Sequence, residues 1–288
     1  MAKSTPRTIL LALGGWVGVV LVAMIWLSFQ LRDLGHLTVR FLDVGQGDAA
    51  LIITPAGNQI LVDGGPDNTL IHKIGRALPL WDRTIELVVV SHPHADHLVG
   101  LVELLRRYRV RQVISTGVGT DTPEYQTFHQ ELQRQHIAEI VVDGAARQRL
   151  EPGLELRWFP PLNINSKDLN TTSLALQLAY GSTTFLLLGD LPASSQEALP
   201  LAQLKSDVLK VAHHGSSDAL SLTAHSLIHP AWAVISVGEN NYGHPSPRVQ
   251  KTLERINTKV LTTRANGDVR LQSDGRTVQF FRSPQPRR

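Results

Sequence analysis

Most of the chain alternates between short apolar runs and turn residues. The runs before residue 66 follow one another as antiparallel hairpins do, and a turn-forming Pro55-Ala56-Gly57-Asn58 separates two of them. The predicted strands occupy residues 37–44, 48–54, 59–65, 85–91, 111–117, 138–143, 154–159, 173–180, 183–189, 206–215 and 231–238, with a last hairpin at 263–281. Helical spacing of apolar residues predicts helices between them, at 70–78, 97–108 and 124–136.

This order of elements indicates the fold class. Hairpins come first, αβ units follow, and strands return near the end, where Asn266-Gly267 and Asp274-Gly275 are strong turn pairs. We therefore expect an α/β sandwich of two sheets with helices on the outside, formed as one domain over residues 35–282. The tail at 283–288 is expected to be frayed.

The first segment predicts a membrane anchor at residues 1–34. From Thr8 to Leu31 there are 24 residues without a charge, and roughly 20 suffice for a helix to cross a bilayer. Lys3 and Arg7 precede this span, which favours a cytoplasmic N-terminus and a hydrolase domain outside the cytoplasm. A cleaved signal peptide is the alternative, although the apolar stretch exceeds the usual length and lacks a small-residue cleavage site.

Composition excludes several classes of protein. Hydrophobic residues make up 42% and charged residues 18% of the chain, which is typical of a globular protein. The absence of cysteine excludes disulfides and thiolate metal sites. A formal net charge of +3 suits an anionic partner but identifies none.

Four potential metal ligands fall within six positions after the apolar run at 85–91. His92, His94, Asp96 and His97 occupy the corner between that strand and the next predicted helix. A rigid corner of this kind can bring imidazole and carboxylate groups into one small volume, as a dinuclear centre of Zn²⁺, Mn²⁺ or iron requires. The alternative is a polar turn in which His94 and Asp96 only cap the helix.

The stretch SHPHADH resembles the signature of metallo-β-lactamase-fold hydrolases. The resemblance implies an αββα sandwich and two divalent ions, Zn²⁺ or Mn²⁺. It assigns His92 and His94 to the first metal, and Asp96 and His97 to the second. LVDGG resembles the preceding motif of the family and implies that Asp63 orients a ligand histidine, the alternative being a simple turn aspartate.

The resemblance also implies two later ligands and reveals one departure. TFLLLGD supplies Asp190 as the bridge between the metals, and VLKVAHHGSS supplies His213 and His214, of which His214 fits the pattern better. Many members carry a further histidine of the first metal before the strand that leads to the bridging aspartate. Residues 166–178 contain none, so Asp168 or Asn170 could substitute, or the first metal has fewer ligands.

Several motifs in one order narrow the resemblance to the soluble hydrolase domain of ComEC-type competence proteins, over nearly all of residues 37–281. They are RFLDVGQGDAALI, VDGG, SHPHADHLVGL, NTTSLAL, LLLGD, LKVAHHGS, ISVGENNYGHPSP and NGDVRLQSDG. The resemblance implies a nuclease that acts on DNA outside the membrane during DNA uptake.

Two motifs suggest contacts with substrate. GQGDAA (45–50) fits a dinucleotide pattern, but strands follow it where that fingerprint needs a helix, so we expect no nucleotide cofactor. In the resembled family this loop lies near the metals, which makes Gln46 and Asp48 candidate contacts with solvent or substrate. A simple tight turn is the alternative. His244 in NNYGHPSP is a candidate for substrate binding or proton transfer, or it only precedes the next helix.

The expected reaction is hydrolysis by a metal-bound hydroxide, because two divalent ions lower the pKa of a shared water. The expected catalytic residues are Asp190, Asp96 and His244. The expected substrate-binding residues are Gln46, Asp48, Asn170 and Ser216. RRYRVR (106–111), Lys205, Lys210 and Arg248 are candidate phosphate contacts, but for any one of them ordinary solvated charge is the stronger interpretation.

DNA is the expected substrate, and two alternatives stay open. A chain with one candidate membrane span cannot form a pore, so DNA import would need a separate polytopic channel protein as partner. The chain could instead hydrolyse a small phosphoester or another ester unrelated to DNA. It could also be a non-catalytic binding module with a degenerate site.

Overall fold

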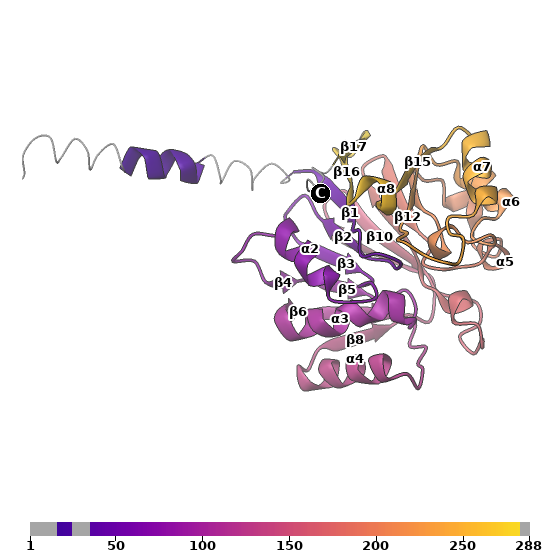
Figure 1. Cartoon of the computed structure of the whole chain (residues 1–288), viewed down its shortest axis with the longest axis horizontal. Helices are drawn as coiled ribbons and strands as arrows, with labels where there is room; N and C mark the ends of the chain where they lie inside the picture. The colour runs from indigo at the N-terminus through magenta and orange to yellow at the C-terminus, as the bar shows by residue number, and fades with distance from the viewer. Residues whose placement is uncertain (1–15, 25–34, 283–288) are drawn as a thin grey trace, which may run out of the picture.

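The computed structural model describes residues 16–24 and 35–282 of the 288 residues. Two large mixed sheets pack face to face, and helices cover both outer faces, as the sequence predicts. Figure 1 shows α2, α3 and α4 on one side of the molecule and α5, α6 and α7 on the other. These helices are α2 (Thr69–Ala77), α3 (Ala95–Arg107), α4 (Pro123–Arg134), α5 (Ala193–Gln196), α6 (Leu222–Ile228) and α7 (Pro247–Arg255).

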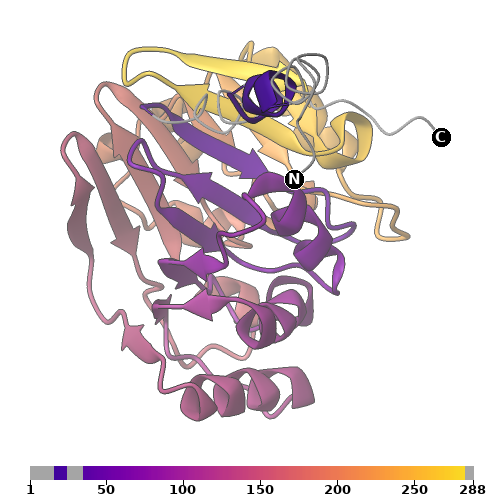
Figure 2. The same ribbon diagram turned by 90° about the vertical axis from the view of Figure 1, so that its left-hand side faces the viewer.

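The first sheet joins the N-terminal strands to the C-terminal hairpin, which lies beside them in Figure 2. Its strands, in spatial order, are β17 (Val278–Arg282), β16 (Val269–Ser273), β1 (Leu37–Phe41), β2 (Ala50–Ile53), β3 (Gln59–Val62), β5 (Leu87–Val89), β7 (Gln112–Ser115) and β8 (Ala138–Val141). Pairing is antiparallel from β17 to β3 and parallel from β3 to β8. The parallel part requires crossover connections, which α2, α3 and α4 supply.

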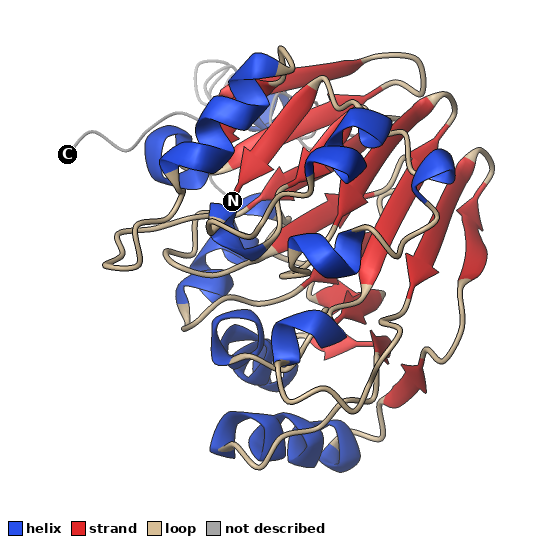
Figure 3. Ribbon diagram, turned by 90° about the vertical axis from the view of Figure 1, so that its right-hand side faces the viewer, coloured by secondary structure: helices blue, strands red, loops and turns tan. Residues whose placement is uncertain are grey.

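The second sheet repeats this change from antiparallel to parallel pairing, and Figure 3 shows helices over its strands. Its strands, in spatial order, are β15 (Lys259–Thr262), β14 (Trp232–Ile235), β13 (Val208–Lys210), β12 (Thr183–Leu187), β11 (Ala175–Tyr180), β10 (Leu154–Phe159) and β9 (Ala146–Glu151). The strands from β9 to β12 are antiparallel, and those from β12 to β15 are parallel. A two-stranded sheet of β4 (Thr84–Ile85) and β6 (Arg109–Val110) completes the set.

Three apolar clusters hold the four layers together. One lies between the sheets and includes Phe41 and Phe185; the second lies under α2, α3 and α4, and the third under α5, α6 and α7. Helix α3 shows how the sequence specifies its layer, because Leu98, Leu101 and Leu105 recur at helical spacing and are buried. This arrangement confirms the predicted two-sheet sandwich.

Several local predictions need correction. The apolar run at 85–91 divides into β4 and β5. The predicted hairpin at 263–281 begins instead with a short helix α8 (Thr263–Asn266), so only the turn at Asp274-Gly275 joins two strands. Strands β9 and β15 were not predicted. Strand β9 is exposed over most of its length and rich in arginine, and it therefore lacks the apolar alternation that marks a half-buried strand.

The predicted membrane span at 8–31 lies largely outside the described residues. Its described part, residues 16–24, is helical and exposes large apolar side chains such as Trp16 and Val22. Within the described ranges, every helix is too short or too polar to traverse a bilayer.

His225 in α6 makes stability dependent on pH. Its ring is buried, and neither ring nitrogen forms a hydrogen bond with a described residue. Burial lowers the pKa of His225 to about 4, so the ring is neutral in the folded protein near pH 7. The unfolded chain takes up a proton at a higher pH, near 6.5, than the folded chain does. The free energy of unfolding must therefore fall as the pH drops between these two values.

We expect His225 alone to cost about 2 kcal/mol of stability between pH 7.5 and pH 5. A His225→Leu variant should lose about that much less than the wild type over the same interval, because leucine has no proton to gain. Urea unfolding at both pH values measures the difference. Equal losses in the two proteins would contradict the prediction.

Candidate metal centre

The candidate ligands all follow the carboxyl ends of parallel strands, two strands from each sheet. They are Asp63 after β3, His92 to His97 after β5, Asp190 after β12 and His214 after β13. The first two strands belong to one sheet and the last two to the other. The site therefore lies at the edge where both sheets end, which is where open α/β sheets place their ligands.

His92 and His94 form the first group of donors. His92 is buried, and its Nε2 lies 3.0 Å from Nδ1 of His94. The Nδ1 of His92 lies 3.1 Å from the Ser91 hydroxyl, which leaves Nε2 to face His94 and the carboxylate of Asp190. Two imidazole nitrogens directed at one point are the arrangement expected of two ligands of one ion.

Asp96, His97 and His214 form the second group. Nε2 of His214 lies 3.1 Å from Oδ2 of Asp96, and these atoms lie within 4.8 Å of a ring nitrogen of His97. Nδ1 of His214 pairs with the carbonyl oxygen of Ser236 at 3.0 Å, and Nδ1 of His97 pairs with Asp63 at 2.9 Å. Because a carbonyl or carboxylate oxygen accepts a hydrogen bond from each Nδ1–H, Nε2 is the ring nitrogen available to a metal ion.

Asp190 lies between the two groups. Its Oδ2 is 3.3 Å from Nε2 of His97, 3.8 Å from Nε2 of His214 and 3.9 Å from Nε2 of His92. Its Oδ1 accepts a hydrogen bond from the backbone N–H of His213, and Ser173 Oγ accepts one from the Asp190 N–H. One carboxylate oxygen thus faces both groups, which is the position expected of a bridging ligand.

Asp63 supports the ligand histidines through hydrogen bonds. Its carboxylate accepts hydrogen bonds from the backbone N–H and the hydroxyl of Ser91, both at 2.7 Å, and from His97. Through Ser91 it also fixes the ring of His92. The structure therefore places Asp63 where an orienting residue must lie.

A buried ion pair lies beneath the centre. Lys210 is 3% exposed and donates to the carboxylate of Asp48 and to the carbonyl oxygen of Gly189, and it lies 3.8 Å from Oδ1 of Asp190. Asp48 is buried as well and lies 3.4 Å from Nδ1 of His214. The predictions that Asp48 contacts substrate and that Lys210 contacts phosphate are wrong, because each side chain is buried against the other.

The electrostatics of the cluster favour added positive charge. Burial alone would lower the pKa of His97 and His214, but Asp190 and Asp63 raise that of His97 well above its usual range, and Asp190 and Asp48 raise that of His214 to about 9. Burial would raise the pKa of Asp190, yet the charges on His97 and His214 hold it well below the usual range. The carboxylates therefore outweigh the one buried lysine.

The donor set fits divalent metal ions. The groups that face inward are imidazole nitrogens and carboxylate oxygens, which suit Zn²⁺, Mn²⁺ and iron. Nε2 of His97 is buried and has no hydrogen-bond partner among the described residues. A cation within this cluster would both provide that partner and offset the excess of negative charge.

An opening of about 800 Å³ leads to the second group. Its lining includes Gln46, Asp96, His214 and His244, and a contact of Gln46 or His244 with substrate stays a prediction. Burial and the nearby rings of His213 and His214 lower the pKa of His244. The neutral imidazole at the mouth of the site could exchange a proton with a bound molecule.

Other predicted residues lie elsewhere. Ser216 is buried, and its hydroxyl donates to Asp218, so its predicted contact with substrate is wrong. Asp168 accepts a hydrogen bond from the backbone of Asn170 and is exposed, away from the donor groups. Asn170 lies 3.4 Å from the ring of His213, at the edge of the site.

The backbone separates the two consecutive histidines. His213 and His214 both have positive φ angles, of 46° and 51°, which turn the chain sharply after β13. The ring of His214 points to Asp96, whereas the ring of His213 faces Asn170 and Asp218. The geometry thus favours His214 as the ligand.

Sequence reasoning missed the supporting residues Ser91, Ser173 and Ser236, and the counter-ion role of Lys210. Serine next to a motif carries no signal of its own. The one available hint for Lys210 was its position inside the apolar run VLKVA, where an exposed lysine would interrupt a buried strand.

Comparisons with known proteins agree with this site. The sequence pattern of the metallo-beta-lactamase superfamily matches residues 42–238. ComE operon protein 3 of Bacillus subtilis (strain 168) is 26% identical over 263 residues, which cover 84% of this chain and 34% of that protein. Recombination protein 2 of Haemophilus influenzae is 28% identical over 260 residues, which cover 88% of this chain and 31% of that protein. The chain thus spans about a third of the length of these relatives.

A solved structure shows the same fold. The metallo-beta-lactamase fold protein YhfI from Bacillus subtilis superposes with a TM-score of 0.59 at 12% identity, covering 82% of this chain and all of that one.

The two adjacent histidines provide a matched pair of variants. His214→Ala should lower the affinity for Zn²⁺ or Mn²⁺ by about 100-fold or more, because it removes a donor atom from the second group. His213→Ala should change the affinity by less than about threefold, because its ring faces away from Asp96. Isothermal titration with each metal measures both values, and similar losses in the two variants would refute the assignment.

Lys210→Met should destabilise the metal-free protein by about 3–5 kcal/mol, because it leaves Asp48 buried without its counter-ion. Adding Asp48→Asn should recover at least half of that loss, since the double variant buries no unpaired charge. Urea unfolding of the wild type, the two single variants and the double variant measures the four free energies of unfolding in this double-mutant cycle. If Lys210→Met were as stable as the wild type, the Lys210–Asp48 ion pair would contribute nothing to stability.

Proposed function

The chain belongs to the metallo-beta-lactamase superfamily and is a metal-dependent hydrolase related to competence proteins; from this premise we propose that it hydrolyses phosphodiester bonds in DNA. The observation that carries the proposal is the position of Asp190, whose Oδ2 faces the imidazoles of both donor groups at once. A site for two neighbouring cations suits displacement at a phosphate, where the attacking and the leaving oxygen both need stabilisation.

The protein's own side chains define the centre in this proposal. His92 and His94 would hold one divalent ion, Asp96, His97 and His214 the other, and Asp190 both. Such ions, when bound, lower the pKa of water and stabilise charge on phosphate oxygens. Asp63 and Ser91 fix the rings of His97 and His92, so that the donors need not reorganise during the reaction.

His244 is the residue we propose for binding the substrate at the mouth of the site, where its neutral ring would donate a hydrogen bond to an oxygen of the phosphodiester. It lines the opening beside His213 and Gln46, outside the donor groups. Asn240 holds its backbone, accepting from the His244 N–H at 3.0 Å and donating to its carbonyl oxygen at 2.8 Å. The ring is thus kept at the mouth of the site.

The choice of DNA rests on the relatives. ComE operon protein 3, recombination protein 2 and competence protein ComA of Neisseria gonorrhoeae match most of this chain at 26–28% identity. The first and third names refer to competence and the second to recombination. This chain spans about a third of each relative. A separate polytopic protein that forms a DNA channel is part of the proposal, as the partner of this chain.

Attachment to a membrane through the N-terminal segment is also part of the proposal. It is supported by the uncharged stretch from Thr8 to Leu31 and by the basic residues Lys3 and Arg7 before it. The hydrolase domain would then act outside the cytoplasm.

The test uses the full chain, stripped of metal and reloaded with Mn²⁺ or Zn²⁺. We expect it to cleave end-labelled single- or double-stranded DNA, and His94→Ala to cleave at least about 100-fold more slowly, because a donor is lost. Cleavage is followed on denaturing gels. Hydrolysis of bis-p-nitrophenyl phosphate without any cleavage of DNA would redirect the proposal to small phosphoesters. Hydrolysis of neither would contradict it.

A further inference from the structure

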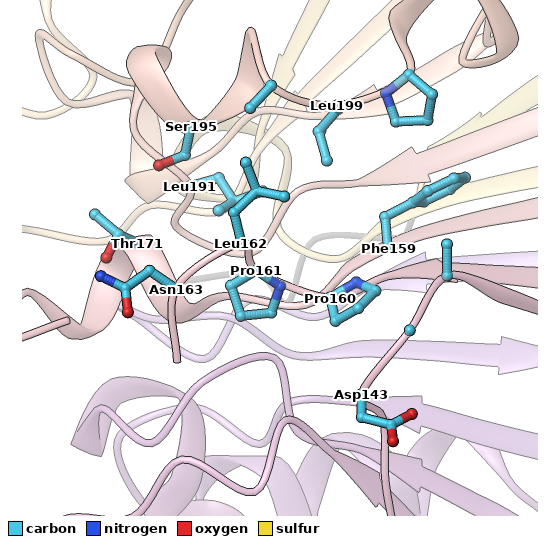
Figure 4. Close-up of a pocket in the computed structure, with 14 residues that line it drawn as sticks. Asp143, Phe159, Pro160, Pro161, Leu162, Asn163, Thr171, Leu191, Ser195 and Leu199 are labelled. Atoms are coloured by element: carbon cyan, nitrogen blue, oxygen red, sulfur yellow. The ribbon is translucent and has the colours of Figure 1, made fainter. Parts of the chain in front are cut away.

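A second cavity of about 440 Å³ lies beside the metal centre (Figure 4). Three segments of the chain form it: the turn before β9, the loop after β10 and the segment around α5. Its lining residues are Asp143 to Ala145, Phe159 to Asn163, Thr171, Leu191, Ser195 and Ala198 to Pro200. No described residue with metal-binding geometry lines it, so it is distinct from the site of the proposed hydrolysis.

The cavity has an apolar wall and a polar end. Phe159, Pro160 and Leu199 supply flat or branched apolar surface, and Leu162, which is 86% exposed, stands at its mouth. In Figure 4 the side chains of Thr171 and Asn163 lie next to each other, away from Phe159. An aromatic ring with hydrogen-bonding groups on one edge suits such a cavity, and a nucleobase has that form.

Some residues that line the cavity are direct chain neighbours of residues at the metal centre. Thr171 and Leu191 line the cavity; Asp190, next to Leu191, belongs to the donor groups, and Asn170, next to Thr171, lies at the edge of the site. One strand of nucleic acid could therefore reach both places with adjacent or nearly adjacent nucleotides, because neighbouring residues are only about 3.8 Å apart along the chain.

Basic residues continue from the cavity along the outer face of the second sheet. Arg157 lies two positions before Phe159 in β10, so the two side chains share a face. Arg147 of β9 is directly opposite Arg157, and Arg149 is opposite Glu155. Like charges placed directly opposite on neighbouring strands repel each other. The one carboxylate among them, Glu155, pairs with Arg157 at 2.5 Å and leaves a net positive surface.

We propose that this cavity and the arginine face form a binding site for single-stranded DNA. One unstacked base enters the cavity against Phe159, and Arg147, Arg149 and Arg157 contact the phosphates beside it. This inference rests on the proposed function and specifies the form of its substrate. A duplex does not fit, because its bases are stacked inside the helix and cannot enter a cavity without being flipped out.

The alternative basic run at 106–111 lies elsewhere. Arg106 and Arg107 end helix α3, whose first residues carry Asp96 and His97. A helix of 13 residues is roughly 20 Å long, so these arginines are remote from the metal centre. Arg107 and Arg111, which lies four positions further along the chain, just before β7, serve as a matched control for the loss of positive charge.

The first test measures binding of a fluorescein-labelled 12-nucleotide oligo-dT to the full chain in EDTA, by fluorescence anisotropy. Arg147→Gln/Arg157→Gln should weaken binding by about tenfold and reduce the slope of log Kd against log salt by about 1.4, as expected for two lost contacts with single-strand phosphates. The control Arg107→Gln/Arg111→Gln should leave both values unchanged. Equal losses in the two double variants would overturn the proposal.

The second test addresses the cavity itself. Replacing one base of the oligonucleotide with an abasic residue, at each position in turn, should weaken binding to the wild type by about tenfold at the position that enters the cavity. Ala198→Trp, which fills the cavity from an exposed position, should abolish this sensitivity. An abasic penalty that persists in Ala198→Trp would show that the base binds elsewhere.

The two proposals fail in different ways. If the wild-type chain cleaves DNA and the Arg147/Arg157 variant binds the oligonucleotide as tightly as the wild type, only the proposed binding site is overturned. A wild-type chain that shows both binding effects without hydrolysing any phosphodiester would overturn only the proposed reaction.

Discussion

Four aspartate carboxylates share the edge where the two sheets end, and much of the surrounding structure serves to compensate their charge. Lys210 pairs with Asp48, and the rings of His97 and His214 lie against Asp63, Asp96 and Asp190. Charges removed from water are costly unless they are paired and hydrogen-bonded. The remaining negative charge makes the cluster selective for cations, and the same bonds that satisfy the aspartates also fix the orientation of the imidazole donors.

Close packing of glycines brings these groups together. A side-chain carbon on Gly100 of α3 would lie 2.0 Å from the carbonyl oxygen of Gly64, and one on Gly64 would collide with Leu101. The backbone N–H of Gly64 donates to the carbonyl oxygen of His97 at 2.6 Å. Because α3 approaches the turn after β3 so closely, Asp63 reaches His97. The start of the helix is thus in direct contact with the first sheet.

The sequence predicted the two-sheet sandwich, and it singled out the six residues that the structure brings together as the donor groups, because apolar periodicity and ligand spacing are local properties of the chain. It failed where the outcome depends on distant partners. Asp48 and Lys210 are 162 positions apart, and only their meeting in the core makes one a counter-ion of the other. The polar edge strand β9 was missed for a related reason, since its pairing with β10 and not its own composition makes it a strand.

The division of the donors between the two sheets has a consequence for biosynthesis. The first sheet contributes residues up to His97, and the second contributes Asp190 and His214 more than 90 positions later in the chain. A chain emerging from the ribosome can pack its first helices against β3 and β5 well before it can enclose an ion. Any ion held by donors of both sheets could therefore be enclosed only after the two halves have docked.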